Sequence, residues 1–508
     1  MRGIPPSVYS SFFKPKTVKM VTATAIILIL YAAVILWFVV QGARKTKSMS
    51  DYAVGSVQFS PYMVGLSLAA ASTSAATFII NPGFISLYGI SGVLAFAVFM
   101  PLGKYLSLLF MTKRFRKQGI NVKAISMAQW IGRRYNTQFG SILFAVLSLL
   151  LVSFMVLICV GMTKVISQAL QIGEITALTG IVIFVFGYMM FGGANSMVYT
   201  NTIQAFMKLI VAVIMLSSGY TYFSEGIHHF LEQLNQIDPL LTATTNPKSP
   251  LFRDYFEIIF CPFVIGIAIV CQPHIITKSL LLKGDEDVNK YLFAGICAEI
   301  IFFSVVFVGL YARLSFPDLM NNGVAMKMDG IVSAYVVKEF PVWLGLVVVF
   351  GLISSGLATF EGLIQSLSTT ITTDIIGQFS KNTEGGRLMI LNKIVIICLA
   401  ILTFFLTKEQ LLNPKLSVGI FAQLGVYAFF SAAFMPVVMG IFLKNVPTIA
   451  PIAAAIAAVV VHFGTYFGSI SPYLQGVVKN PAVSATYAIL TATIIGFSLY
   501  FLLKDKSK

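Results

Sequence analysis

The chain of 508 residues combines 57% hydrophobic residues with only 11% charged residues, and its mean hydropathy is +0.87. Soluble domains carry roughly 25% charged residues, so the composition excludes an ordinary water-soluble protein and indicates burial in a lipid bilayer. The net charge of +16 does not indicate nucleic-acid binding, because the basic residues flank apolar runs and form no basic face with interleaved aromatic residues. The five cysteines are scattered singly and lack the spacing of a metal site.

Apolar runs of about 18 or more residues, long enough to cross a bilayer, predict about thirteen transmembrane helices. The predicted spans are 20–42, 60–88, 92–112, 139–171, 176–192, 199–224, 255–277, 289–313, 341–373, 388–407, 416–442, 448–468 and 484–503. The first run is long for a signal peptide and no small-residue cleavage site follows it, so we expect a retained helix. The longest connections, 225–254 and 314–340, leave no room for a soluble domain.

Basic residues in the connections predict the orientation of the chain. An odd number of spans places the two termini on opposite sides, and cytoplasmic connections carry an excess of Lys and Arg. The richer set of alternate connections comprises Arg44 to Lys47, Lys113 to Arg134, Lys278 and Lys283, Lys381 to Lys393, and the carboxyl-terminal tail. The amino end has the opposite bias, with Arg2, Lys14, Lys16 and Lys19. We predict a multi-pass protein of the plasma (inner) membrane, with an extracytoplasmic amino-terminal segment, 1–19, and a cytoplasmic tail, 504–508.

Two predicted spans contain helix-breaking residues within their apolar runs. The interruptions are Ile80-Asn81-Pro82-Gly83 in 60–88, and Cys261-Pro262 and Gln272-Pro273-His274 in 255–277. Proline removes a helical hydrogen bond, and freed backbone groups at membrane depth are tolerated only beside protein or a wet cavity. Interrupted spans at corresponding positions of two halves indicate a transporter with inverted repeats, here 60–224 and 255–442; ordinary proline kinks are the alternative. The run 20–42 is then an extra first helix, and 448–503 forms two accessory helices.

Four segments resemble the sodium:solute symporter family, and they occur in the family's order. The segments are Ser74 to Phe78 with the Pro-Gly that follows, Gly192-Gly193 with Tyr199 to Gln204, Gln272 to Ile275, and Ser354 to Asp374. The first segment is similar to the first core helix of acetate and proline permeases, and the second to the family's Gly-Gly segment with a Thr-Asp-x-x-Gln sequence. The third is similar to the Gln-Pro-His-Ile motif of proline, acetate and pantothenate carriers, and the fourth to the family's ion-site helix. The resemblance covers residues 45–440. It implies the LeuT-type fold, an all-α five-plus-five inverted repeat, and cation-driven uptake by alternating access.

The resemblance also implies a sodium site. Carried over residue by residue, the carbonyl ligands fall on Ala70, Thr73 and Ser355, and the hydroxyl ligands on Ala358 and Thr359. Hard cations need several oxygens, and a broken helix supplies carbonyls that no N–H occupies. Ala358 departs from the family pattern because a methyl group cannot coordinate a cation, so water, Ser72 or Ser74 would have to complete the shell. We expect Na+ as the coupling ion, bound at the four positions that keep an oxygen.

Glu361 is the least ordinary residue of the chain, because a carboxylate within a span is costly unless it is paired or protonated. At helical spacing it lies more than about 100° from the face shared by Ser355 and Thr359, so it does not replace the missing hydroxyl. The alternative mechanism is a proton-coupled symporter in which Glu361 takes up and releases H+. A structural hydrogen bond, for example to Gln365, is the plainer interpretation. Asn201 stands where several members carry Asp, and we assign Glu361 and Asn201 to coupling or gating.

Three further charged residues lie within predicted spans. We interpret Glu299 as one half of a structural ion pair, and Lys208 as a snorkelling or paired residue. Lys164 lies near a helix end, where it either snorkels or attracts an anion into the vestibule.

The two breaks predict the solute pocket. Its expected lining is Thr77, Asn81 and Gly83 from the first break, and Gly266, Gln272 and His274 from the second. Helix amino termini at the breaks favour anionic groups such as a carboxylate. The sugar-transporting members carry Gln at the position of Thr77, so the resemblance implies a small carboxylate-bearing solute: a monocarboxylate, a pantothenate-like compound or an amino acid. His274 is a gate, a proton relay or a satisfied core histidine.

A membrane enzyme and a membrane sensor are the competing functions. An enzyme would need a nucleophile with a base, or a metal cluster, at membrane depth, but the broken spans contain no HExxH or GxSxG motif and the four His are dispersed. A transport-like sensor would have to work through a partner protein, because the tail after Leu503 is short. We predict a transporter, not an enzyme, whose partners are a small-molecule solute and the lipid bilayer. The sequence does not define its oligomeric state.

Overall fold

The computed structural model describes residues 9–56, 59–321, 323–379, 385–414 and 417–504, most of which are helical. The first helices are α1 (Tyr9–Ala43), α2 (Met49–Val54), α3 (Pro61–Ser72), α4 (Asn81–Tyr88), α5 (Ile90–Val93), α6 (Met100–Asn121), α7 (Met127–Arg134), α8 (Gln138–Ser148), α9 (Val152–Leu170), α10 (Glu174–Met189), α11 (Ala194–Ser217) and α12 (Ile227–Ile237). They are followed by α13 (Cys261–Ile269), α14 (Pro273–Ile276), α15 (Asp287–Ser304), α16 (Val308–Ser315), α17 (Ile331–Glu339), α18 (Val342–Thr370), α19 (Gly377–Phe379), α20 (Gly385–Leu412), α21 (Val418–Phe442), α22 (Ile449–Gly468) and α23 (Pro481–Leu503). Strands β1 (Met320–Asn321) and β2 (Val324–Ala325) pair in an antiparallel hairpin before α17.

The helices confirm the predicted all-α, polytopic architecture, but not the count of about thirteen spans. Among the described residues, ten helices are long and apolar enough to cross a membrane, and two bent helix pairs raise the number to 12. The predicted span 176–192 corresponds to α10, which has 16 residues and falls below the length of a full span.

The first broken span bends earlier than the sequence predicts. Its two halves, Pro61–Ser72 and Ala76–Tyr88, meet at 56°, and Thr73 after the first half has an extended backbone. Pro82 lies beyond this bend, in the first turn of α4, directly after a π-helical turn, Ala76–Ile80. A first turn tolerates proline because its N–H groups lack intrahelical partners. Asn81-Pro82-Gly83 therefore marks a change of helix type, and the expectation that it breaks the helix was wrong.

The second broken span bends where the sequence predicts. Its halves, Phe256–Ile269 and Pro273–Leu281, meet at 61°, with Gln272 in an extended conformation between them. Pro262 repeats the arrangement at Pro82, because it stands in the first turn of α13 after a π-helical turn, Phe256–Phe260. The two spans thus share a π-helical turn, a proline and a sharp bend, but in different order.

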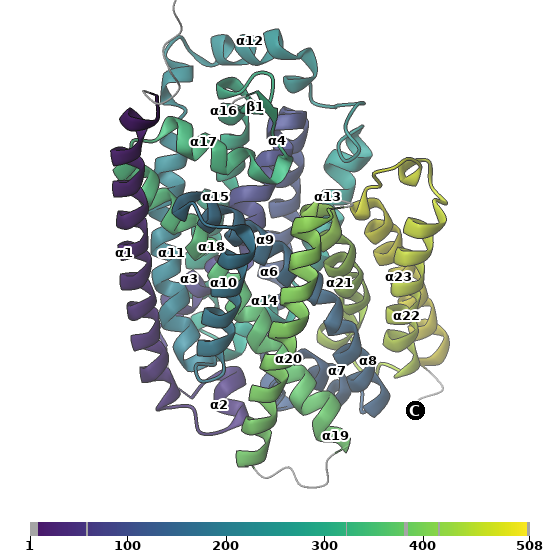
Figure 1. The fold of residues 1–508 in the computed structure, drawn as a ribbon. Helices are drawn as coiled ribbons and strands as arrows, with labels where there is room; N and C mark the ends of the chain where they lie inside the picture. Colours follow the sequence, from purple (N-terminus) through teal and green to yellow (C-terminus); the bar gives the residue numbers. More distant parts are fainter. Residues whose placement is uncertain (1–8, 57–58, 322, 380–384, 415–416, 505–508) are drawn as a thin grey trace, which may run out of the picture.

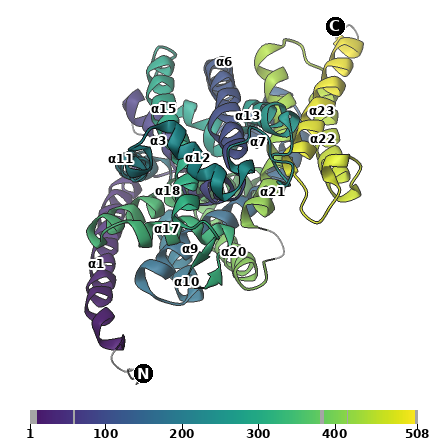
Figure 2. The same cartoon turned by 90° about the horizontal axis from the view of Figure 1, so that it is seen from above.

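The long helices run side by side, with α9 and α18 in the interior of the bundle, while α1 and α23 lie at opposite edges (Figures 1 and 2). The short helix α12 lies across one end, and α2, α7 and α19 lie at the other (Figure 1). Helix α1 begins at the α12 end and α23 ends at the opposite end. Residues 1–8 of the predicted segment 1–19, and 505–508 of the predicted tail, lie outside the described residues. The repeat boundaries and the orientation in the cell stay predictions.

Candidate functional site

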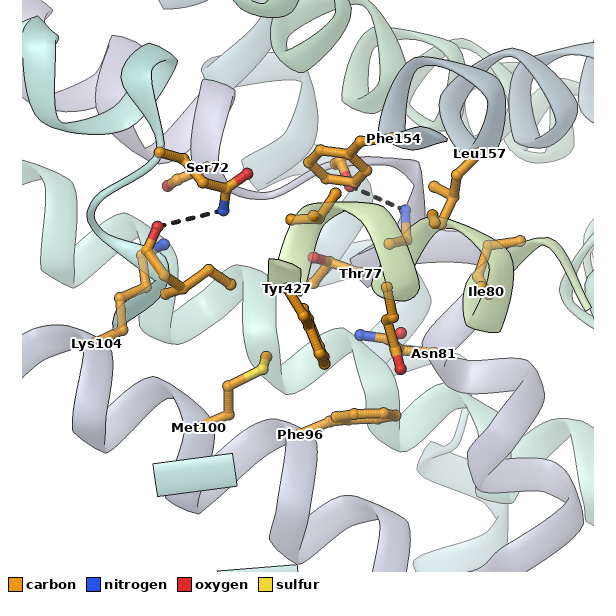
Figure 3. Close-up of a pocket in the computed structure, with 18 of the residues that line it drawn as sticks. Ser72, Thr77, Ile80, Asn81, Phe96, Met100, Lys104, Phe154, Leu157 and Tyr427 are labelled. Atoms are coloured by element: carbon orange, nitrogen blue, oxygen red, sulfur yellow. Dashed lines mark hydrogen bonds between the residues drawn. The ribbon is translucent and has the colours of Figure 1, made fainter. Parts of the chain in front are cut away.

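A cavity of about 90 Å³ lies between the two bent spans and the helices α6, α9 and α21. Its lining includes Ser72, Ser74, Thr77, Asn81, Phe96, Met100, Lys104, Phe154, Leu157, Gln272 and Tyr427. Figure 3 shows Thr77, Asn81 and Tyr427 facing Phe96 and Met100 across the space. The cavity combines aromatic and aliphatic walls with a few hydroxyl, amide and ammonium groups, which is typical of a site for a small organic molecule.

Three of the six predicted pocket residues, Thr77, Asn81 and Gln272, line this cavity, and the other three do not. Gly83 packs against the turn that precedes α17, and a Cβ at this position would stand 2.5 Å from the Met328 carbonyl oxygen. Gly266 sets the close approach of α13 to α6, because a Cβ there would stand 2.1 Å from the carbonyl oxygen of Met100. These glycines are therefore packing positions.

His274, the third residue outside the cavity, is buried in α14, with an exposed fraction of 2%. It lies against Gly362 of α18, and its ring is 6.3 Å from that of Phe154. Neither ring nitrogen has a hydrogen-bond partner among the described residues. The structure therefore leaves the assignment of His274 to gating or proton relay as a prediction.

Lys104 is a cavity residue that the sequence analysis missed. Its Nζ is 2.9 Å from Oε2 of Glu299, and both side chains are buried. Ser72 donates a hydrogen bond to the other oxygen of Glu299. Glu299 thus forms the ion pair that the sequence analysis expected. The signal for Lys104 was present, because it is a charged residue inside the predicted span 92–112, the same argument that selected Glu299.

The predicted sodium ligands lie close together, but a lysine occupies two of them. Nζ of Lys208, a residue of α11 with no exposed surface, donates to the carbonyl oxygens of Ala70 at 2.6 Å and Thr73 at 2.5 Å. Lys208 is therefore buried between helices: of the two expected alternatives, it does not snorkel, and its partners are backbone carbonyls. Ala70 lies in the last turn of α3 and Thr73 directly follows the helix, where the bend removes the N–H groups that would pair with these carbonyls in a continuous helix.

Two predicted sodium ligands belong to α18, the carbonyl of Ser355 and the hydroxyl of Thr359, and the hydroxyl groups of both residues donate within the protein. Thr359 Oγ1 donates to the carbonyl oxygen of Ala71 at 2.7 Å, and Ser355 Oγ donates to that of Leu352 at 2.6 Å. Ala358 is buried in a cluster with Ala70 and Ala205. A hard cation needs several oxygens around one point without a neighbouring positive charge. With the Lys208 ammonium in this place, the four predicted residues do not fit a bound sodium ion.

Glu361 lies in a separate buried network between α10, α11 and α18. Its carboxylate accepts hydrogen bonds from Tyr188 Oη at 2.5 Å, Thr200 Oγ1 at 2.7 Å and Gln204 Nε2 at 3.0 Å. The expected bond to Gln365 is not among them, because Gln365 donates to the backbone of α2 instead. The carboxylate is satisfied by three donors on neighbouring helices, which matches the plainer, structural interpretation of this residue.

Asn201 extends this network towards α3. With its nitrogen directed to Glu361 at 3.2 Å, its oxygen accepts from Lys278 Nζ at 3.1 Å and from Ser67 Oγ at 3.2 Å. Lys278 itself is buried and donates to Ser67 at 2.8 Å. Lys278 is therefore part of the second bent span and not of a cytoplasmic connection, and the prediction that placed it there was wrong. The structure thus brings Asn201 and Glu361 together in one connected set of side chains, while their role in coupling stays a prediction.

Long apolar helices, together with two bent spans beside a cavity that carries a few polar groups, define a membrane-embedded secondary transporter. Residues 52–457 match the sequence model of the sodium:solute symporter family, so the chain belongs to this family, whose members are transporters and not enzymes. The sodium/pantothenate symporter of Escherichia coli (strain K12) is 24% identical over 484 residues, which cover 92% of this chain and 95% of that protein. The high-affinity proline transporter PutP of Bacillus subtilis (strain 168) is 22% identical, covering 78% of this chain and 82% of that protein.

A solved structure supports the fold. The chain superimposes on a Na+-coupled sialic acid symporter with a TM-score of 0.76 and 17% sequence identity, over 94% of this chain and 97% of that one. This similarity confirms the predicted LeuT-type arrangement of the helices. It does not define the solute, because function lies in the residues of the site and not in the fold.

Proposed function

We propose that the protein imports a small carboxylate-bearing solute by alternating access, and that the solute binds in the cavity beside Lys104. The observation that carries the proposal is the position of this ammonium group in the wall of a cavity between the two bent spans. An inward ion gradient drives the uptake, as the family name implies for its members.

Lys104 has hydrogen-bonding capacity for a ligand. An ammonium group carries three hydrogens, and Glu299 is its one carboxylate partner within the described part of the chain. A solute carboxylate beside Lys104 gains charge-assisted hydrogen bonds, which are about twice as strong as neutral ones. The Lys104–Glu299 pair also keeps the empty site neutral, so that the wall is not left with an unpaired charge.

Gln272 offers a second contact on the same cavity. Its Nε2 donates to the carbonyl oxygen of Ile269 at 3.2 Å, whereas its Oε1 has no partner among the described residues. An unpaired buried amide oxygen favours a solute with a hydroxyl or N–H group next to the carboxylate. The volume of about 90 Å³ is that of a few water molecules, so the site in this conformation fits a compact solute.

The named solutes of the relatives include both acids and sugars. Pantothenate, proline and monocarboxylate transporters match the chain, but so do sodium/glucose and sodium/myo-inositol cotransporters. The Lys104 ammonium is the feature of this chain that favours an acid over a neutral sugar.

Uptake into proteoliposomes tests the proposal. Purified protein should accumulate at least one of radiolabelled pantothenate, proline or acetate, and the others should compete according to affinity. The double variant Lys104→Met with Glu299→Gln removes both charges of the pair and should lose at least about tenfold in apparent affinity, a loss expected when a charged hydrogen bond to the solute is removed.

A second ion pair provides the matched control. Lys164 and Glu174 are 2.8 Å apart and do not line the cavity. Lys164→Met with Glu174→Gln should therefore keep the parental affinity. Equal affinity of the parent and the Lys104 double variant would contradict the proposed solute site, and so would the failure of every tested acid to accumulate.

A further inference from the structure

The last turn of α3 ends in backbone carbonyls that its own helix cannot satisfy, because the chain becomes extended at Thr73. Three of these carbonyls receive side-chain donors from other helices. Thr359 of α18 donates to Ala71, and Lys208 of α11 donates to both Ala70 and Thr73. One ammonium group thus bridges two carbonyl oxygens at 2.6 and 2.5 Å in the interior of the bundle.

We propose that the Lys208 ammonium is a built-in substitute for a sodium ion at the end of α3, so that this protein needs no sodium at this position. The ammonium and the sodium ion each carry one positive charge, and each is stabilised by the partial negative charge at a helix carboxyl terminus. The ammonium binds the carbonyls of Ala70 and Thr73, two of the three carbonyls that the family resemblance assigns to sodium.

Carbonyl dipoles and aromatic rings around Lys208 stabilise its positive charge. No carboxylate lies within ion-pair distance of Lys208 in the described part of the chain, since Glu299 pairs with Lys104. Besides the two carbonyls, the Phe78 and Phe302 rings face Nζ, with their centroids at 6.0 and 5.8 Å. Carbonyl oxygens and aromatic faces are a suitable environment for an unpaired buried cation.

The opposite wall of the position lacks one of the two hydroxyl oxygens that the family resemblance assigns to sodium. Ala358 presents a methyl group, and it packs in a cluster of small buried residues with Ala70 and Ala205. A cation supplied by the chain and a hydroxyl missing at Ala358 are two independent observations, and both indicate that sodium is not bound at this position.

Sodium binding without any solute gives the decisive test. The melting temperature of the purified full-length chain is measured in sodium, potassium and choline chloride at equal ionic strength, together with binding of radiolabelled sodium. The parent should melt at the same temperature in all three salts and bind no sodium at this position. A specific cation that binds the folded state raises the melting temperature, so a sodium-selective rise in the parent would overturn the proposal.

A double variant tests the converse. Lys208→Ala with Ala358→Ser frees the two carbonyls and restores a hydroxyl, and it should acquire a sodium-selective rise in melting temperature. Ala358→Ser alone, which keeps the lysine, is the matched control and should not respond. A folded double variant that ignores sodium overturns the proposal, and the parent measurement decides the question even if the double variant does not fold.

The inference rests on the proposed function only in describing the protein as an ion-driven transporter, and the two fail separately. A parent that binds no sodium and takes up none of the tested acids contradicts the proposed solute but supports the substitution by Lys208. A parent that binds sodium selectively and takes up an acid contradicts the substitution by Lys208 but supports the proposed solute.

Discussion

The hydroxyl group of Thr359 donates to the carbonyl oxygen of Ala71 at 2.7 Å and so ties α18 to the last turn of α3. Thr359→Val keeps the shape of the side chain and removes the donor, which leaves a buried carbonyl oxygen without this partner. We expect a loss of about 1–3 kcal/mol of stability, the cost of an unsatisfied buried polar group. Thermal unfolding should show the same loss in sodium and in potassium. Thr359→Ser, which keeps the donor, is the control, and a loss confined to sodium would contradict the expectation.

Glu361 is predicted to be a structural acceptor whose removal damages the fold. Glu361→Leu leaves the donors of Tyr188, Thr200 and Gln204 unpaired, at a cost of about 1–3 kcal/mol for each buried group. We expect this variant to lose its monodisperse peak in size-exclusion chromatography. Glu361→Gln keeps one acceptor oxygen and should remain folded with a lowered melting temperature. Equal stability of the Leu variant and the parent would refute the role.

Gly266→Ala should prevent correct packing of α13 on α6, because the added Cβ would stand 2.1 Å from the Met100 carbonyl oxygen. Backbone atoms cannot move aside as a flexible side chain can, so we expect a loss above about 2 kcal/mol, the range of overpacked cores. Gly464→Ala in α22 is the matched control, since a Cβ there meets nothing within 4 Å. Helix propensity predicts that this control is stabilised by roughly 1 kcal/mol. The two melting temperatures should move in opposite directions.

Asp329 gives the protein a pH dependence outside its membrane spans. Burial raises the pKa of this carboxyl, although the backbone N–H of Val418 donates to it at 3.5 Å. Folding therefore favours the protonated form, and the stability that this group contributes is present at low pH and is lost as the pH rises through the raised pKa. Asp329→Asn should flatten this part of the stability profile and raise the melting temperature at neutral pH. A steeper profile in the variant would contradict the assignment.

The orientation of the chain can be tested with cysteine labelling on intact cells. Glu232 on α12 and Lys117 near the end of α6 are exposed, and the two helix ends lie at opposite ends of the bundle (Figure 1). With the amino end outside, Glu232→Cys should react with a membrane-impermeant maleimide, whereas Lys117→Cys should react only after permeabilisation. The parent, with its natural cysteines, provides the background. Labelling of both variants in intact cells would refute the predicted orientation.

The features that the sequence predicted correctly are local ones. Apolar runs define helices, so the all-α membrane fold followed from hydropathy, and the bend at Gln272 followed from the proline beside it. The position of the first bend did not follow, because Pro82 is accommodated by a π-helical turn and the backbone becomes extended at Thr73, which no breaker residue marks.

The contacts that define the site could not be predicted in the same way. Lys208 and Ala70 are 138 residues apart, and whether a buried lysine snorkels or bridges carbonyls depends on which helix faces it. The missing hydroxyl at Ala358 was visible in the sequence, but the group that compensates for it lies on another helix. Likewise, Lys104 in the cavity wall pairs with Glu299 only through the packing of α6 on α15.

A tethered ammonium group also changes the electrical character of a transport cycle. A bound ion crosses the membrane with the solute, whereas the charge on Lys208 stays with α11 and returns with it. Membrane voltage performs work only on charge that moves, about 2.3 kcal/mol per elementary charge for each 100 mV. The position at the end of α3 therefore contributes no net current, and the voltage dependence of uptake reports only on ions bound elsewhere in the protein.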